Sequence, residues 1–75
     1  MNINELGELL IKKNVSKEMY SLDGGLPSEA YCIEKIGSKW HLYYSERGTK
    51  WTIHYFDNEG DVVEAFLEEI DKNTK

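Results

Sequence analysis

The sequence predicts an α+β fold of two layers: a three-stranded antiparallel meander, with a fourth strand left open, flanked by an N-terminal and a C-terminal helix. Two observations lead to it. Segments near both chain ends carry apolar residues at spacings of three and four, and three segments between them are rich in β-branched and aromatic residues separated by short turns. Helices on one face of a sheet make a stable arrangement. The 75 residues form one small domain, residues 1–75.

The two helices are predicted from their apolar stripes. The first is expected at residues 3–13, where Asn4 can cap the start. Its stripe follows the spacing of Ile3, Leu6, Leu10 and Lys13, and Leu9 widens it. The second is expected at about residues 58–71, capped by Asp57 or Asn58. Its stripe consists of Val62, Val63, Phe66, Leu67 and Ile70.

Strands are predicted by runs of aromatic and β-branched residues between turn signals. They are expected at residues 30–36, 39–45 and 50–56. Gly37-Ser38 has the composition of a two-residue hairpin turn, and Gly48 can take the positive φ that a second turn needs. Residues 14–29 are the irregular part of the chain, and the sequence leaves open whether Tyr20–Leu22 form an edge strand.

Composition narrows the classes of function. The net charge is −5, whereas proteins that bind nucleic acid usually carry a basic excess, so nucleic acid is an unlikely partner and a basic protein a better one. The single cysteine, Cys32, cannot form an internal disulfide, and no stretch has the length of a membrane span. The first residues lack the features of a signal peptide. We therefore expect a cytoplasmic protein without a membrane partner.

No motif in the sequence carries chemistry. A phosphate-binding glycine loop, a nucleophile elbow and a metalloprotease helix are all missing from it. Cys32, His41 and His54 lack the close spacing of metal ligands, so we interpret them as a small buried strand residue and two ordinary strand histidines. Catalytic use of Glu46 with a histidine has no supporting motif. The expectation is a protein that is not an enzyme and uses no cofactor or metal.

Aromatic side chains give the first candidate binding surface. Rings occur on both alternating faces of the second and third predicted strands, so the helices cannot bury all of them. They are either cross-strand pairs or an exposed platform for a partner, and a homodimer could cover the same face. The charged turn between these strands could serve as a recognition loop. The candidate contact residues are Trp40, Tyr43, Trp51, Glu46 and Arg47.

Acidic side chains of the last helix give the second candidate surface. Residues 57–75 contain seven acids and two lysines, a local balance of −5. Five of the acids repeat at spacings of four and three, which places them on one helix face. That face is either simply solvated or steers a basic partner such as the cleft of a nuclease. The five acids are Asp57, Asp61, Glu64, Glu68 and Asp71.

The runs Tyr20–Cys32 and Trp40–Gly48, followed by the helix start Phe56–Glu59, resemble small immunity proteins of bacterial polymorphic toxin systems, of the contact-dependent inhibition type. The resemblance covers about fifty positions. It implies a cytoplasmic protein that binds and neutralises a cognate toxin domain, often a nuclease, without catalysis. It names neither the toxin nor any contact residue.

An alternative is a small DNA-binding module that uses its sheet. A three-stranded sheet followed by a helix, with Lys50-Trp51 at a strand start, is similar to the AP2-like DNA-binding domains of phage integrases. Residues 30–56 contain four basic and two acidic residues, a balance of only +2. That is a weak charge for binding phosphates.

Overall fold

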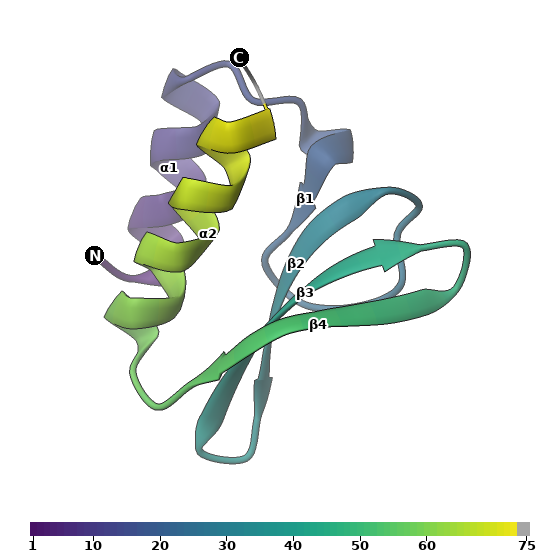
Figure 1. Ribbon diagram of the computed structural model, residues 1–75. Helices are drawn as coiled ribbons and strands as arrows, with labels where there is room; N and C mark the ends of the chain where they lie inside the picture. The colour runs from purple at the N-terminus through teal and green to yellow at the C-terminus, as the bar shows by residue number, and fades with distance from the viewer. Residues whose placement is uncertain (74–75) are drawn as a thin grey trace.

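The computed structural model describes residues 1–73 and confirms the predicted α+β class (Figure 1). A four-stranded sheet is flanked by one helix from each end of the chain. None of the helices within residues 1–73 has the length and apolarity needed to cross a membrane. In chain order the elements are α1 (Ile3–Lys12), the 3-10 turn η1 (Lys17–Met19), β1 (Tyr20–Ser21), β2 (Ala30–Ile36), β3 (Lys39–Glu46), β4 (Thr49–Phe56) and α2 (Glu59–Asn73).

The sheet has the order β1-β2-β3-β4. β2, β3 and β4 form the predicted antiparallel meander. The open question about Tyr20–Leu22 is resolved, because Tyr20–Ser21 form a short fourth strand that pairs in parallel with β2. The antiparallel pattern therefore stops at β2. Residues 22–29 connect β1 to β2 and return the chain so that β2 runs in the same direction as β1, as a parallel pair requires.

Both hairpin turns use a backbone conformation that favours glycine. Gly37 has a φ of 61° and Ser38 does not have a positive φ, which is the pattern of a type II′ turn. At the second turn Arg47 has a φ of 51° and Gly48 a φ of 78°, the pattern of a type I′ turn. The predicted positions of both turns are confirmed.

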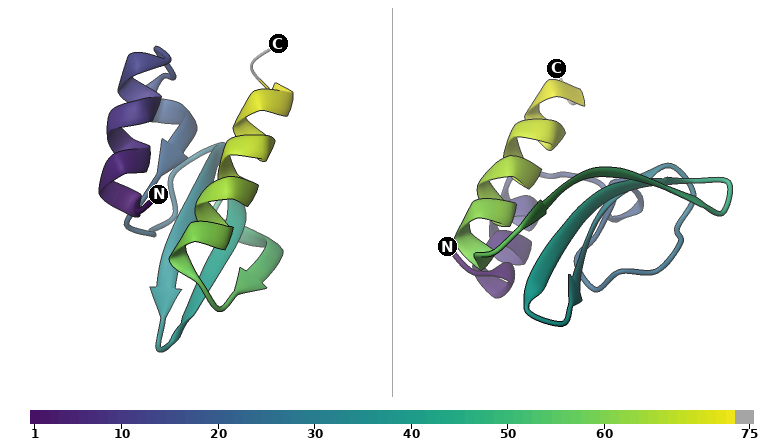
Figure 2. Two further views of the ribbon diagram at one scale, coloured as in Figure 1. Left: turned by 90° about the vertical axis from the view of Figure 1, so that its left-hand side faces the viewer. Right: turned by 60° about the horizontal axis from the view of Figure 1, so that its bottom comes forward.

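The helices lie side by side on one face of the sheet and begin at the same end of the molecule (Figure 2). At that end the Ile3 N–H donates to Glu59 Oε2 at 2.7 Å. At the other end the Lys13 Nζ lies 3.2 Å from Asp71 Oδ1. A carboxylate at the helix N-termini and a lysine at the C-terminus of α1 both suit the helix dipoles.

The predicted cap of the first helix is wrong, because Asn2 caps α1 and Asn4 lies inside it. The Asn2 side chain accepts from the Glu5 N–H at 2.8 Å, and the Glu5 carboxylate accepts from the Asn2 N–H at 3.0 Å. This capping box needs an acid three residues after the cap, which Asn2 has and Asn4, followed by Gly7, does not. Asn58 directly precedes α2, and its amide donates to Asp61 at 3.2 Å.

The main core lies between the helices and the sheet. Leu67, expected in the stripe of α2, is only half-buried beside it. The fully buried members are Leu6, Leu10, Ile33, Leu42, Val62, Val63, Phe66 and Ile70.

A second, smaller cluster occupies the opposite face of the sheet and consists of Ala30, Cys32 and Tyr43. Burial raises the pKa of the Cys32 thiol, as suits the predicted buried strand residue. Residues 22–29 pack along this face, where the Tyr43 hydroxyl donates to the Gly25 carbonyl at 2.6 Å. The connection from β1 to β2 thus covers part of the sheet face that the helices leave uncovered.

Candidate functional site

The five acids predicted to share a face at the C-terminal helix divide into two groups. Asp57 and Asp71 at its two ends are exposed but engaged, with Lys39 at 2.7 Å and Lys13 at 3.2 Å. The hydrogen bond from Lys39 and its positive charge lower the pKa of Asp57. Their charges are therefore partly neutralised within the molecule.

The middle of the helix keeps its charge. Asp61, Glu64 and Glu68 are exposed, and none of the three forms an ion pair with a residue in the part of the chain that the structure describes. Glu64 and Glu68 lie one turn apart, so two like charges stand next to each other on the outer side of α2. Asp61, Glu64 and Glu68 are called the acidic row below.

The candidate aromatic residues have different environments. Tyr43 is fully buried beneath residues 22–29, so its ring offers no surface to a partner and its proposed contact role is wrong. The alternation of side chains along the strand could not show this, because it does not reveal which loop covers a face of the sheet. Trp40 is half-buried against the main core, with Lys35 Nζ 5.4 Å from its ring centre. Trp51, in contrast, is 58% exposed on the edge strand β4.

The structure brings together an aromatic ladder that the sequence did not single out: Tyr31, Tyr44 and Trp51. They are direct cross-strand partners on β2, β3 and β4, so their side chains lie on one face. The Tyr31 and Tyr44 ring centres are 4.9 Å apart. Tyr31 packs against the main core, which places the ladder on the helix-facing side of the sheet. Only the register between the strands could have revealed this ladder.

The outer end of the ladder is the pair Tyr44–Trp51, with Trp51 on the edge strand β4. This pair lies close to the turn between β3 and β4, which projects away from the helices (Figure 1). Glu46 is two residues after Tyr44 and so lies on the same face. Burial raises the pKa of Tyr44, and the charges of Glu29 and Glu46 raise it further. Arg47 at the tip of the turn is exposed, while Glu46 is half-buried. Two carboxylates thus flank the outer end of the ladder.

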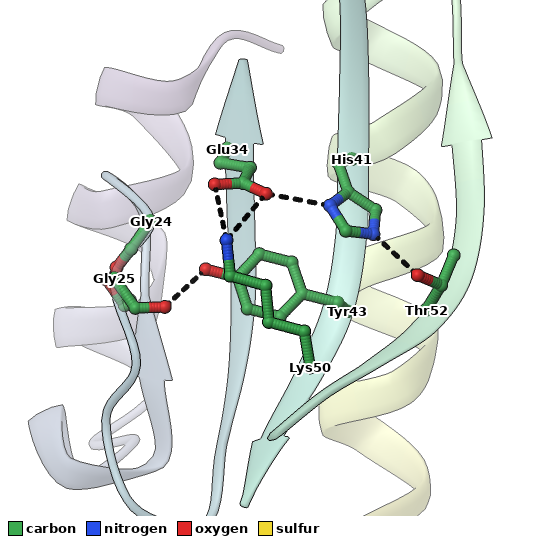
Figure 3. A network of polar contacts seen from close by, with 8 residues as sticks. Gly24, Gly25, Glu34, His41, Tyr43, Lys50 and Thr52 are labelled. Carbon is green, nitrogen blue, oxygen red and sulfur yellow. Dashed lines mark hydrogen bonds and ion pairs between the residues drawn. The ribbon is translucent and has the colours of Figure 1, made fainter. Parts of the chain in front are cut away.

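A polar network lies on the opposite face of the sheet (Figure 3). Glu34 Oε2 is 2.8 Å from His41 Nδ1, and His41 Nε2 is 2.9 Å from Thr52 Oγ1. Lys50 Nζ reaches both Glu34 oxygens at 3.2 Å. Burial alone would raise the pKa of Glu34, but the hydrogen bonds from His41 and Lys50 outweigh it, and the net shift is downward. Glu34 is thus a carboxylate that accepts from the His41 ring.

The order carboxylate, imidazole, hydroxyl is also that of a nucleophilic triad. A triad further needs a hollow beside the hydroxyl in which a substrate can lie. The hollow that Glu34 lines is shared with Leu22, Trp40 and Glu59 and includes neither His41 nor Thr52. His41 is 4% exposed and has a partner on each ring nitrogen, which is the usual state of a buried polar group. We therefore interpret the network as a set of contacts that stabilises the sheet face opposite the helices, called the outer sheet face below.

The histidines and the cysteine do not come together. His41 belongs to the outer face, whereas His54 pairs with the core residue Leu42 and contacts the Phe56 ring at 4.8 Å. Among residues 1–73, no group of three or more His, Cys, Asp or Glu side chains is placed to hold a metal ion. His41 is also not paired with Glu46, the carboxylate considered for catalysis with a histidine, since the partners of its ring are Glu34 and Thr52.

Comparisons with models of protein families, with curated proteins and with solved structures each find no match. The case for a function therefore rests on two exposed surfaces: the acidic row on α2 and the outer end of the aromatic ladder.

Proposed function

We propose that this protein binds a basic protein domain and neutralises it, in the manner of an immunity protein that blocks a cognate bacterial toxin, with a nuclease as the expected toxin class. The acidic row carries this proposal. Adjacent like charges on a helix cost a few tenths of a kcal/mol each, and here no ion pair within residues 1–73 offsets them. A basic partner would supply that missing charge.

A nuclease offers a suitable basic surface, because its cleft must attract the phosphates of nucleic acid. A row of carboxylates can occupy such a cleft by charge complementarity and accelerate the encounter. Blocking a cleft in this way needs no catalysis by the inhibitor. The proposal therefore agrees with the lack of catalytic motifs in the sequence.

The DNA-binding alternative receives less support. Of the four basic residues between positions 30 and 56, Lys39 is paired with Asp57 and Lys50 with Glu34. Lys35 lies over the Trp40 ring. Phosphate binding would have to break these contacts or depend on Arg47, so strong, salt-sensitive DNA binding is not expected.

Co-expression with toxin domains encoded in the same locus tests the proposal. We expect one of them to be neutralised and to form a complex with the purified protein. The double variant Glu64→Lys/Glu68→Lys is expected to slow association about tenfold or more at low salt, because it reverses the acidic row. The matched control is Glu8→Lys/Glu18→Lys, which makes the same change in net charge at two other exposed acids.

Two results would contradict the proposal. If no toxin domain of the locus is neutralised or bound, the immunity role is wrong. If both double variants slow association equally, the acidic row has no special role and only the net charge of the protein matters.

A further inference from the structure

The outer end of the aromatic ladder combines exposed ring surface with negative charge. Trp51 is 58% exposed, and its cross-strand neighbour Tyr44 contacts Tyr31 on the same face, with the two tyrosine rings tilted by 58°. The π face of an aromatic ring carries negative charge, so an exposed ring attracts a positive group that lies over it. An apolar group would gain burial there, and a cation would gain both burial and electrostatic attraction.

Two carboxylates lie at this end of the sheet. Glu46 pairs with Thr49 across the strands, and this pair is next to Tyr44–Trp51 on the same face. Glu29 directly precedes β2 and has a left-handed φ of 52°. The next residue, Ala30, pairs with Ser45, so Glu29 lies at the same end of the sheet as Glu46. Neither Glu29 nor Glu46 forms an ion pair with a residue between 1 and 73.

A planar guanidinium fits these two features better than other side chains. It can lie flat on the Trp51 indole while its N–H groups donate to a carboxylate at the edge of the ring. An ammonium would gain the charge interaction but lose the stacking. A neutral apolar side chain would leave the carboxylates without partners.

We propose that the outer end of the ladder, Tyr44 and Trp51 with Glu29 and Glu46, binds an arginine side chain of the partner protein. This inference rests on the proposed function for the identity of the partner, but the chemistry of the site is independent of it. The partner would then be held at two places, by the acidic row through charge and by the ladder through one stacked arginine.

The site can be tested without the partner by titrating the protein with N-acetyl-arginine amide and following its NMR spectrum. Citrulline amide, which has the same shape without the charge, is the control ligand. We expect saturable shifts of the Trp51 indole N–H, with the Trp40 indole as an internal reference. Glu46→Gln should weaken binding about two- to fivefold, as for one partly exposed ion pair, and Trp51→Leu should abolish it.

Control variants separate this site from general effects of charge and ring exposure. Glu8→Gln removes an exposed acid elsewhere, and Tyr55→Leu removes a ring that is 49% exposed and stacks on His41. Neither should change the affinity for arginine amide. The inference is overturned if citrulline amide gives the same shifts, if the shifts are confined to the acidic row, or if Trp51→Leu binds as the wild type does.

The same variants distinguish the two proposals in the toxin assay. If a toxin is neutralised, Trp51→Ala should weaken the complex about tenfold or more, as for an exposed aromatic anchor. A toxin neutralised equally by wild type and Trp51→Ala would overturn the ladder inference and leave the immunity role standing. Arginine amide binding at Trp51 without any neutralised toxin would overturn the immunity role and leave the ladder site standing.

Discussion

Gly24 shows how much one residue can fix the cover of the outer sheet face. It is buried, with a φ of +79°, and a Cβ on it would lie 3.2 Å from Glu34 Cβ. Its N–H donates to the Ile33 carbonyl at 3.0 Å, which ties residues 22–29 to β2. The next residue, Gly25, accepts from Tyr43. Any side chain at position 24 would push the cover away from the polar network.

We therefore expect Gly24→Ala to lower the free energy of unfolding by about 1–3 kcal/mol, through backbone strain and crowding against Glu34. Gly48→Ala is the matched control, since its φ is +78° but a Cβ there would meet nothing within 4 Å. It should cost about 1 kcal/mol from strain alone. Urea unfolding of both variants measures the difference, and equal losses would show that crowding at position 24 is unimportant.

The lowered pKa of Glu34 predicts how the stability of the protein changes in acid. Hydrogen bonds from His41 and Lys50 hold its pKa below the ordinary value of 4.5 in spite of burial. Since the folded pKa is the lower one, the contribution is complete above the unfolded pKa and is lost as the pH falls through the folded pKa. Stability should therefore be steady near neutral pH and decline in the acid range below about 4.5.

Urea unfolding from pH 7 to pH 3 checks this. Glu34→Gln should lower stability at pH 7 by about 1–3 kcal/mol, because buried His41 loses a charged partner. Its deficit relative to wild type should shrink as the pH falls. A deficit that stays constant down to pH 3 would show that Glu34 does not stabilise the fold through its charge.

At the scale of elements, the β3–β4 hairpin has a register shift between Leu42 and Tyr43 and, at its turn, a residue in an unfavourable backbone conformation. Its type I′ turn places Arg47 at a φ of 51°, where asparagine and glycine are preferred. The same hairpin carries Trp51 and Glu46, and β4 forms the edge of the sheet. A strained arginine is thus retained at the tip of the element that carries one of the two candidate surfaces.

Arg47→Asn should raise the free energy of unfolding by about 0.5–1 kcal/mol by relieving that strain. Arg47→Lys keeps both the backbone strain and the positive charge, so it should leave the free energy of unfolding unchanged. Thermal and urea unfolding compare the two. Equal stability of Arg47→Asn and wild type would mean that the turn tolerates arginine at no cost.

At the scale of the molecule, both helices depend on one core. Phe66 is fully buried at its centre and meets Tyr20 of β1 edge to face, with ring centres 6.3 Å apart. One side chain therefore links α2 to the first strand of the sheet. In a chain of 75 residues the total stability is expected to be only about 4–11 kcal/mol.

Phe66→Ala should lower the free energy of unfolding by about 3–5 kcal/mol, a large part of that total, and lower the unfolding midpoint accordingly. Leu67→Ala, at the half-buried neighbouring position, should cost clearly less. Circular dichroism of the helices during thermal unfolding measures both. A midpoint for Phe66→Ala that matches that of Leu67→Ala would contradict a single shared core.

The molecule also separates its two candidate surfaces. The acidic row lies on α2, while the ladder ends at the turn that projects away from the helices (Figure 1). The exposed acids of the row and the exposed indole of Trp51 therefore offer two places for one partner.

Local signals in the sequence were enough to determine the helices, the three main strands and the two hairpin turns. Apolar spacing places Phe66 and Ile70 in the core, and glycine marks the turns at positions 37 and 48, because these depend on neighbours only a few residues apart. The acidic row could also be predicted, since helical spacing alone sets which residues share a face.

Only the tertiary structure decided which side chains are buried and which segments cover them. Tyr43 and Trp51 are both aromatic residues of predicted strands, yet residues 22–29 help to bury Tyr43 whereas Trp51 is 58% exposed. The parallel pairing of β1, the Glu34–His41–Thr52 network and the ladder with Tyr31 and Tyr44 all depend on strand register. Register and loop cover join residues far apart in the chain, and no short pattern in the sequence records them.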